Sequence, residues 1–480
     1  MKEGFFVLLT IDIGTTVFKS AIWDFDGKRL AYSSVPVTSF PPDGMRHEAD
    51  SGQWLKAFAG CCAALAGTAV QLTEIKAVVI SGNGPSLIPV LGEPELNSGG
   101  LCVKAAPARL WLDRRAEAAA RKVSSLTKAF VDPGFIIPKA LGLKTSEPQL
   151  YEKTRLFLGC PELLAYALTG EARTVFPAEG FERWFWNTQL LETLNLDERK
   201  FPRFIRPMEI FGSLIPSVAG HFGFTPGIPV ISGGPDFIAA ILGTGIARPG
   251  QVCDRAGSSE GINVCTEQRI DDSRLMSYSH PVKPYWNLSG IISTTGKAID
   301  WAKNLLGIGS YDDFFALAEA APDKGEKPVF LPYLAGERSP VWNPQARGVM
   351  RNISLETGRP EFARSVLEGI CFAIRDIISV MEEAGAAVNE LRTAGSAAGS
   401  GILNRIKADV LGREILIPVH REAELLGLAV AGAVALGVYS SVYEASSALV
   451  RIESHVQPDS KKSMHYAILF NEYIQMRNEK

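Results

Sequence analysis

Continuous apolar runs that end in glycine-rich turns alternate with segments of helical periodicity along most of the chain. The apolar run 5–11 predicts a buried strand, and alternating positions on both sides of Asp26-Gly27 predict a hairpin soon after it. The runs 75–80 and 228–232 predict further buried strands. Strands that alternate with helices in this way are typical of an α/β protein.

Helical periodicity is clearest at 53–70, 109–126, 150–168, 362–384 and 464–478. The Pro- and Gly-rich stretch 201–229 is predicted to link two halves of the chain. The uncharged segment 425–443 has the length of a membrane span. Its glycines and many alanines favour instead a slender helix that packs closely in a core.

The two halves of the chain contain a similar strand–turn–strand motif. Each has a strand, a turn of Gly, Ser or Thr, and a second strand: DIGTT at 12–16 and AGSSEG at 256–261. The two halves are similar in the order of their predicted elements more than in their residues. This similarity predicts two related domains that face one another.

Composition narrows the class of protein. The chain has 480 residues, 46% hydrophobic and 21% charged, so it can bury a large core and is not an intrinsically disordered chain. A net charge of −3 gives no basic footprint for nucleic acid or an anionic membrane. Seven scattered cysteines without a CxxC pair argue against a disulfide framework or a zinc site. Because the first residues lack a signal-peptide pattern, a cytoplasmic location is expected.

The residues after the first strand predict a phosphate cradle, although neither a P-loop nor a GxGxxG motif is present. Gly14 allows the backbone to approach an anion closely, and Thr15 and Thr16 offer N–H groups and hydroxyls. Asp12 is placed to hold a hydrated Mg²⁺ ion, and Lys19 adds positive charge. For this motif alone, an ordinary hairpin turn with a solvated lysine stays open as the alternative.

Three features of the second half point to the same chemistry. Gly257-Ser258-Ser259 matches the first turn, and two such turns can clamp one polyphosphate. Asp236 follows a strand and a Gly-Gly-Pro bend, where an aspartate serves either as a helix N-cap or as a general base in phosphoryl transfer. The small residues at 395–401 either leave room for a flat ring or simply cap the next helix.

Taken in chain order, these motifs have a known counterpart. LLTIDIGTTVFKSAIWDFDG is followed by DPGFIIPKALGL, PVISGGPDFIAAILGTGIARPG, AGSSEG and TAGSAAGSGILNRIKADVLGREI. They resemble, in order, the first phosphate motif, the first signature, the catalytic-Asp segment, the GTS turn and the adenosine motif of the FGGY family of carbohydrate kinases, within the actin/hexokinase/Hsp70 ATPase superfamily. The resemblance spans nearly the whole chain, and Gly142 stands where the first signature usually has Trp.

The resemblance implies an α/β fold of two actin-like (ribonuclease H-like) domains that flank a catalytic cleft. It places a sugar-side N-terminal domain at 1–227 and an ATP-side C-terminal domain at 228–480, and leaves open whether the terminal helix 464–478 returns to the first domain. It implies ATP-dependent phosphorylation of a sugar or polyol hydroxyl, with Asp236 as general base. The partner is then a small-molecule sugar, and family members are often homodimers.

By position, the resemblance also assigns the remaining site residues. Phosphate contacts are Gly14, Thr15, Thr16, Lys19, Gly257, Ser258 and Ser259. Adenosine contacts are Gly296, Asp300, Gly395, Ser396, Ala397 and Ser400. Substrate contacts are Asn83, Gly84, Trp111, Asp113, Asp236 and Phe237. Asp12 binds Mg²⁺ through water.

Departures from the family pattern bear on the substrate. Glycerol kinases have an Arg-Glu pair where this chain has Gly84-Pro85, and a Tyr where it has Gly134, so glycerol is not expected. Xylulokinases have Asn after the catalytic Asp, where this chain has Phe237. A buried sugar hydroxyl left unpaired there costs about 1–3 kcal/mol.

The expected substrate class is still a pentulose of the xylulose type. Trp111, Asp113 and Arg115 are closer to the lining residues of ketopentose kinases than to those of other members. Because Phe237 replaces a hydrogen-bonding side chain, the pocket is expected to suit a less polar or deoxy sugar.

Two other classes of function stay open from the sequence. The GSS turn, Phe237 and the reduced sugar loop are also compatible with a catalytically weak member that binds sugar and ATP as a regulator. An Hsp70-like or actin-like ATPase would need a peptide-binding or polymerising module, for which the chain has no spare domain. Sugar-dependent release of ADP would identify a kinase. Stabilisation by sugar without turnover would identify a binding protein. Hydrolysis of ATP that does not depend on sugar would identify an Hsp70-like or actin-like ATPase.

Overall fold

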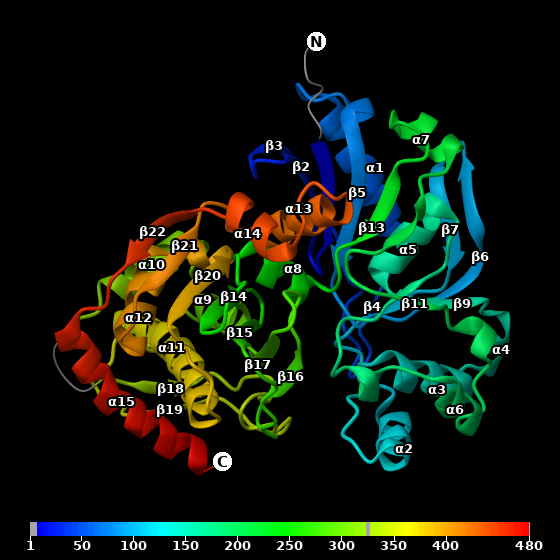
Figure 1. Cartoon of the computed structure of the whole chain (residues 1–480). Coiled ribbons are helices and arrows are strands. Elements are labelled where there is room, and N and C mark those ends of the chain that lie inside the picture. The colour runs from blue at the N-terminus through cyan, green and yellow to red at the C-terminus, as the bar shows by residue number, and fades with distance from the viewer. Residues whose placement is uncertain (1–6, 323–326, 480) are drawn as a thin grey trace. The chain divides into compact units, whose positions relative to one another are not determined.

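The computed structural model describes residues 7–322 and 327–479, which fold as two compact units. Within these residues, unit 1 runs to Gly243 and resumes over Glu424–Leu449, whereas unit 2 covers Thr244–Ala423 and resumes at Val450. Each unit is built on one large mixed β-sheet accompanied by helices (Figure 1).

Unit 1 has a six-stranded sheet in the order β12-β13-β5-β1-β2-β3. Its strands are β1 (Val7–Ile13), β2 (Val17–Asp24), β3 (Arg29–Pro36), β5 (Ile75–Gly82), β12 (Ile210–Ser213) and β13 (Pro229–Ser232). Smaller sheets join β6 (Ile88–Asn97) with β7 (Gly100–Ala105) and β9 (Leu156–Leu158), β4 (Glu48–Ala49) with β8 (Ala108–Arg109), and β10 (Thr174–Val175) with β11 (Phe204–Ile205). The helices are α1 (Gly52–Ala66), α2 (Glu117–Thr127), α3 (Ile136–Ser146), α4 (Pro148–Lys153), α5 (Cys160–Thr169), α6 (Thr188–Thr193), α7 (Pro216–Phe222), α8 (Asp236–Gly243), α13 (Ala423–Ala435) and α14 (Val442–Leu449).

Unit 2 has a seven-stranded sheet in the order β16-β17-β15-β14-β20-β21-β22. Its strands are β14 (Gln251–Ala256), β15 (Glu260–Thr266), β16 (Met276–Ser279), β17 (Trp286–Ile292), β20 (Glu390–Gly395), β21 (Ile415–Pro418) and β22 (Ile452–Val456). A separate pair joins β18 (Val329–Leu331) with β19 (Val349–Arg351). The helices are α9 (Gly296–Leu305), α10 (Tyr311–Glu319), α11 (Arg359–Glu383), α12 (Gly401–Leu411) and α15 (Ser460–Asn478).

The two large sheets share one strand arrangement. From β3 through β2, β1, β5 and β13 to β12, the neighbours are antiparallel, antiparallel, parallel, parallel and antiparallel. From β17 through β15, β14, β20 and β21 to β22, the sequence of directions is the same. The predicted relationship between the halves is thus confirmed at the level of topology, and the β1–β2 turn corresponds to the β14–β15 turn.

The division between the units differs from the expected one at 227/228. Since β13 pairs in parallel with β5, the chain stays in unit 1 as far as Gly243. The segment that returns to unit 1 is α13 with α14, and Gly427 of α13 lies so close to Ala239 of α8 that a Cβ atom would collide with its carbonyl oxygen. The terminal helix α15 belongs to unit 2, where the hydroxyls of Tyr473 and Tyr333 are 3.2 Å apart.

The predicted core position is confirmed for the first part of the uncharged segment 425–443, whereas positions 434–441 are half-buried or exposed. From Ala423 to Ala433 every residue of α13 is buried, and a Cβ atom on Gly432 would meet Val79 and Leu8 of the unit 1 sheet. Among residues 7–322 and 327–479, no helix combines the length and the apolar character that a bilayer crossing requires.

Three predicted segments differ in the structure. In 109–126, α2 begins only at Glu117, because the preceding residues form turns tied to distant parts of the chain. The stretch 150–168 divides into α4, β9 and α5, since Leu156–Leu158 pairs with β6 and Pro161 lies in the first turn of α5. The expected linker 201–229 forms β11, β12 and α7 inside unit 1.

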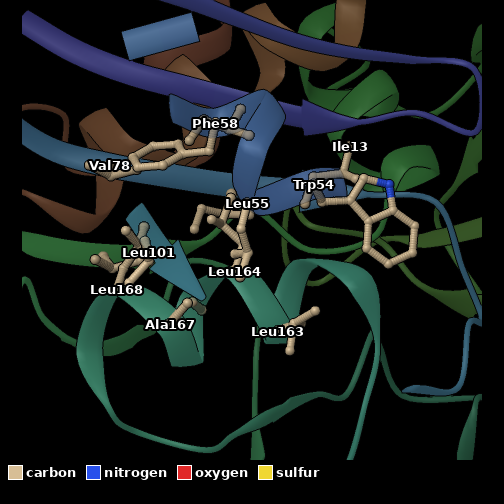
Figure 2. Packing of buried hydrophobic residues seen from close by; sticks show 14 of the residues in the cluster. Ile13, Trp54, Leu55, Phe58, Val78, Leu101, Leu163, Leu164, Ala167 and Leu168 are labelled. Carbon is tan, nitrogen blue, oxygen red and sulfur yellow. The ribbon is translucent and has the colours of Figure 1, made fainter. Parts of the chain in front are cut away.

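The core of unit 1 fixes α1 and α5 against the sheet. Figure 2 shows Trp54, Leu55 and Phe58 of α1 in one apolar cluster with Val78 of β5 and Leu164 of α5, and each is at most 2% exposed. Burying a side chain of this size stabilises the fold by about 1.5–3 kcal/mol. The strand ends that carry the predicted site therefore project from a rigid base.

Candidate active site

The turn after β1, where a phosphate cradle is predicted, is closed by a backbone hydrogen bond. The Gly14 amide donates to the carbonyl of Val17 at 3.0 Å, and a Cβ atom on Gly14 would lie 2.5 Å from that oxygen, so only glycine fits. Asp12 is 6% exposed near the end of β1. In the antiparallel register of β1 and β2 it lies opposite Lys19. The indole N–H of Trp111 donates to the hydroxyl of Thr15 at 3.4 Å, which brings the predicted sugar-side tryptophan to this turn.

Three parallel strands of unit 1 end at the same edge of the sheet, and the predicted residues follow them. Asp12 of β1 is paired in register with Ser81 of β5, and β13 runs parallel to β5 on its other side. The Ser81 hydroxyl donates to the carbonyl of Gly234 at 2.7 Å. This bond fixes the bend that leads from β13 into Asp236.

Asp12 and Asp236 are brought close to one buried thiol. Burial raises the pKa of Cys160, and the neighbouring carboxylate of Glu162 raises it further. The carboxylates of Asp12 and Asp236 act on the same thiol in the same direction. Two residues more than 200 positions apart in the sequence thus act electrostatically on the same buried group of unit 1.

Asn83 has a role in the fold as well as a predicted role in the site. Its backbone N–H and its side-chain Nδ2 both donate to the carbonyl of Ile13 at 2.8 Å, and its Oδ1 accepts from Ser86. Its side chain therefore joins the β5 loop to the β1 turn. At the next residue, Gly84, a Cβ atom would make only an ordinary contact, with the Ser86 amide nitrogen at 3.9 Å.

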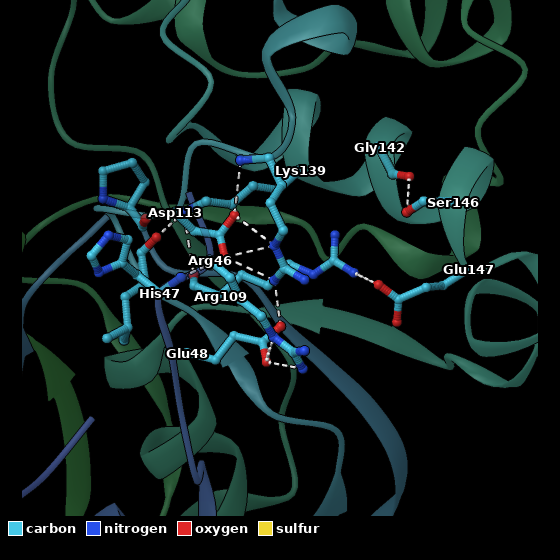
Figure 3. A network of polar contacts seen from close by, with 12 residues as sticks. Arg46, His47, Glu48, Arg109, Asp113, Lys139, Gly142, Ser146 and Glu147 are labelled. Atoms are coloured by element: carbon cyan, nitrogen blue, oxygen red, sulfur yellow. Dashed lines mark hydrogen bonds and ion pairs between the residues drawn. The ribbon is translucent and has the colours of Figure 1, made fainter. Parts of the chain in front are cut away.

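The loop that carries the predicted substrate contact Asp113 is held by the network of charges in Figure 3. Asp113 is 1% exposed, and its carboxylate accepts from the His47 amide at 3.1 Å and from the Arg115 guanidinium. Burial raises the pKa of Asp113, but the hydrogen bonds from Arg115 and His47 outweigh burial, so the pKa lies below its ordinary value. Arg115 also forms an ion pair with Glu48.

Lys139 is a central residue that the sequence did not single out. It is fully buried, and its Nζ donates to the carbonyls of Pro85 at 2.9 Å, Leu110 at 2.7 Å and Arg109 at 3.2 Å (Figure 3). Burial lowers the pKa of Lys139 to about 7. The signal that could have found it is a single charge inside the apolar run FIIPKALGL.

Phe237 belongs to a stack of aromatic rings. Its ring lies 5.7 Å from that of Phe181 at 18°, Phe181 meets Trp184 edge-on, and Trp184 stacks on Phe135 at 5.6 Å. Gly134 precedes Phe135, and a Cβ atom on it would lie 2.6 Å from the carbonyl oxygen of Trp111. A tyrosine, which the family pattern gives for glycerol kinases at this position, does not fit here. The surroundings of Phe237 in unit 1 are therefore aromatic.

In unit 2 the β14–β15 turn is joined to the start of α9. The Gly257 amide donates to Ser259 O at 3.0 Å, and the Gly257 carbonyl accepts from the Gly296 amide at 3.0 Å and from the Thr295 hydroxyl at 3.1 Å. A Cβ atom on Gly296 would lie 2.6 Å from the Gly257 oxygen. The amides at the start of α9 thus donate to carbonyls of Gly257 and Ser258 and hold the β14–β15 turn against the helix.

The predicted adenosine loop lies beside that turn. Gly395 is paired with Ala256, has φ +91°, and leaves no room for a Cβ atom against the Ala256 carbonyl. Ser396 and Ala397 follow in a 3₁₀ turn, and Ser400 caps α12 by accepting from the Leu403 amide. The structure therefore brings the predicted phosphate residue Gly257 and the predicted adenosine residue Gly395 close together in unit 2, next to Ala256. Asp300, one turn into α9, accepts from the hydroxyl of Tyr311 at 2.6 Å.

Comparison with known proteins identifies the family. Residues 7–243 match the N-terminal domain, and residues 255–436 the C-terminal domain, of the FGGY family of carbohydrate kinases. The chain belongs to this family. The resemblance drawn from the motifs and the two-domain α/β fold are therefore confirmed.

Relatives of this carbohydrate kinase carry more than one substrate name. The chain is 28% identical over 472 residues to the xylulose kinase of Escherichia coli (strain K12), which covers 95% of each chain. Solved structures of a gluconate kinase and of a ligand-bound xylulose kinase, both from Lactobacillus acidophilus, match with a TM-score of 0.84 at 22% identity. Each match covers 99% of this chain and 98% of the other. These structural matches establish the shared kinase fold.

Proposed function

We propose that this carbohydrate kinase transfers the γ-phosphoryl group of ATP to a hydroxyl group of a small sugar, with Asp236 as the general base. The observation that carries the proposal is the position of Asp236 in unit 1. It follows β13 at the edge where the Gly14 turn and Asp12 also lie, and Ser81 ties down its bend. A carboxylate held beside a phosphate cradle is what phosphoryl transfer to an alcohol requires.

The reaction balances with the groups that the chain provides. The Asp236 carboxylate takes the proton of the sugar hydroxyl, and the oxygen forms a new bond to the γ-phosphorus. The bond between that phosphorus and the β–γ bridging oxygen breaks, and ADP leaves. Positioning of the two reactants and stabilisation of the phosphate charge supply most of the rate in reactions of this kind.

The nucleotide is proposed to bind to the β14–β15 turn and to the loop that follows β20, both in unit 2. Ser258 and Ser259 of the β14–β15 turn offer hydroxyls to phosphate oxygens, whereas the Gly257 amide already donates within the turn. The small residues from Gly395 to Ser400 leave room for the adenine ring against the backbone. Gly395 has φ +91° and lies directly against the Ala256 carbonyl, so the adenosine loop and the β14–β15 turn are adjacent.

Asp12 is proposed to hold a magnesium ion through water. In the described part of the chain, no three His, Cys, Asp or Glu side chains form a group that could hold a metal ion by themselves. A buried carboxylate at a phosphate turn fits magnesium all the same, since this ion keeps several waters and takes its other ligands from the phosphates. When bound, the ion offsets negative charge on the phosphates.

A pentulose is the proposed substrate class. Trp111, Asp113 and Arg115 occupy one loop of unit 1, and the sequence relative from Escherichia coli is a xylulose kinase. Phe237 adds an aromatic ring directly after the general base, so a ketose that lacks one hydroxyl is proposed to bind better than xylulose itself. A sugar acid is the competing class, because one structural neighbour is a gluconate kinase.

Release of ADP from Mg·ATP, measured against ketoses, deoxyketoses, aldoses, polyols and sugar acids, tests the proposal. A single class that turns over at about 1–100 s⁻¹ is expected. Phe237→Asn should raise kcat/KM for xylulose relative to its deoxy analogue by about tenfold, because it restores a hydrogen-bonding side chain. Binding of ATP with no turnover of any sugar would contradict the proposed reaction.

A further inference from the structure

A group of buried charges lies beneath the β14–β15 turn and takes no part in the reaction described above. Lys407 of α12 is 1% exposed, Asp254 of β14 is fully buried, and Glu260 of β15 is 2% exposed. Lys407 Nζ donates to Asp254 Oδ2, to Glu260 Oε1 at 3.1 Å and to the hydroxyl of Thr393 at 3.3 Å. These four side chains are called the Lys407 cluster.

The Lys407 cluster joins both nucleotide loops of unit 2. Glu260 directly follows Ser259 of the phosphate turn, and Lys407 lies on the helix that Ser400 of the adenosine loop caps. Asp254 and Thr393 are register partners on adjacent parallel strands, and the Thr393 hydroxyl donates to Asp254 Oδ2 at 2.9 Å. Figure 1 shows β14, β15, β20 and α12 close together within unit 2.

The charges of the cluster balance only if one proton is shared by the carboxyls. Burial raises the pKa of both acids. The charge of Lys407 outweighs burial for Asp254, so the pKa of Asp254 lies below its ordinary value. The negative charge of Asp254 raises the pKa of Glu260 further. Asp254 Oδ1 is buried and receives no hydrogen bond within the described residues. A proton on Glu260 provides a donor to the Asp254 carboxyl, with which Glu260 shares a hydrogen bond, and leaves one ammonium beside one carboxylate.

We propose that the Lys407 cluster is a positioning device for the second phosphate turn, in which Lys407 and a proton between Asp254 and Glu260 hold the turn in its nucleotide-binding form. The inference rests on the proposed function, since it takes ATP as the ligand of the turn. Because Glu260 is joined to Ser259 by one peptide bond, a shift of its carboxyl group moves the N–H groups and hydroxyls that face the phosphates. A displacement of about 1 Å is enough to weaken such a site strongly.

Single substitutions that unbalance the cluster test its role. Lys407→Met and Asp254→Asn should each raise the KM for ATP and the Kd for ADP by about tenfold or more, and change the KM for the sugar by less than about threefold. Glu260→Ala should act in the same direction. Glu260→Gln, which keeps a donor toward Asp254, should restore nucleotide affinity to within about threefold of the wild type.

A second ion pair in the same unit provides the control for stability. Arg477 of α15 donates to Asp376 of α11 at 2.6 Å, and Asp376 is 2% exposed, but neither residue belongs to the nucleotide loops. Asp376→Asn should lower the melting temperature about as much as Asp254→Asn and leave the Kd for ADP unchanged. The charge-neutral double variant Asp254→Leu/Lys407→Met should regain at least part of the nucleotide affinity, since it buries no unpaired charge.

Direct binding of ADP separates this inference from the proposed reaction. If the wild type binds ADP but phosphorylates no sugar, the proposed reaction is wrong. The positioning role of the Lys407 cluster is then still tested by the Kd values of the variants for ADP. If Lys407→Met binds ADP as the wild type does, or if Glu260→Gln is as weak as Glu260→Ala, the positioning role is overturned. If the wild type binds no ADP, the inference and the proposed function fail together.

Discussion

The Ser81 hydroxyl donates to the carbonyl of Gly234 at 2.7 Å, and so joins the end of β5 to the bend before Asp236. Ser81→Ala removes this buried bond and leaves a carbonyl without its donor, at a cost of about 1–3 kcal/mol. We expect kcat to fall about 3- to 30-fold with little change in the KM for ATP, because the base is displaced while the nucleotide loops of unit 2 are not touched. Steady-state kinetics with the best sugar measures this.

Ser20→Ala is the matched control for that change. Ser20 is buried in the same sheet, and its hydroxyl donates to the carbonyl of Ser33 at 3.4 Å in the middle of β2 and β3. A loss of stability without a loss of kcat is expected. Equal kcat values for the two serine variants would show that the Ser81 bond does not position Asp236.

Lys139 is predicted to hold the sugar-side loops together. Lys139→Met removes a donor from the carbonyls of Pro85, Arg109 and Leu110, and should lower the free energy of unfolding by about 3–5 kcal/mol and raise the KM for the sugar. Lys200→Met is the control, because Lys200 is buried in unit 1 and donates to the carbonyl of Thr154, away from these loops. Denaturant unfolding and sugar kinetics measured on both variants distinguish a local effect on the site from general destabilisation.

Gly395 and Gly385 offer a test of close backbone approach. Both have a positive φ, +91° and +94°, but a Cβ atom would collide with the Ala256 carbonyl at Gly395 and would meet nothing within 4 Å at Gly385. Gly385→Ala should cost only the backbone strain, about 1–2 kcal/mol. Gly395→Ala should cost more and should also weaken binding of ADP. Similar binding of ADP by the two variants would rule out a nucleotide site against this loop.

Glu337 is predicted to give unit 2 a measurable dependence on pH. Its Oε1 accepts from the Ser293 amide at 2.7 Å, it is 3% exposed, and burial raises its pKa from 4.5 to about 7. Because the folded state binds the proton more tightly, this contribution to stability is complete below about pH 4.5 and is lost as the pH rises through 7. Relative to Glu337→Gln, the wild type should lose about 3 kcal/mol over this range. A constant difference between the two proteins from pH 4 to pH 8 would contradict the assignment.

The sequence was informative where local chemistry decides the structure. The turn at Gly14, the strand before Asp236 and the loop at Gly395 are short motifs, and the structure has them in the predicted form. The related topology of the two halves was also predictable, because the first phosphate turn and its counterpart at Gly257 have similar residues.

Long-range contacts account for what the sequence did not predict. A helix over 109–126 has the right periodicity, yet Asp113 is held by His47, 66 residues away, which favours turns before α2. The role of Lys139 depends on carbonyls from two other loops. The return of α13 to unit 1 depends on contacts between its glycines and residues near the start and middle of the chain, which no local pattern records.

The most direct test of the account is the rate of sugar-dependent ADP release by Asp236→Asn. If Asp236 is the general base, kcat should fall by about 10²- to 10⁴-fold, while the melting temperature and the Kd for ADP remain close to those of the wild type. Asp312→Asn, at an exposed aspartate in the first turn of α10, controls for the loss of a helix-terminal charge. Turnover by Asp236→Asn within a few-fold of the wild-type rate would contradict the central claim.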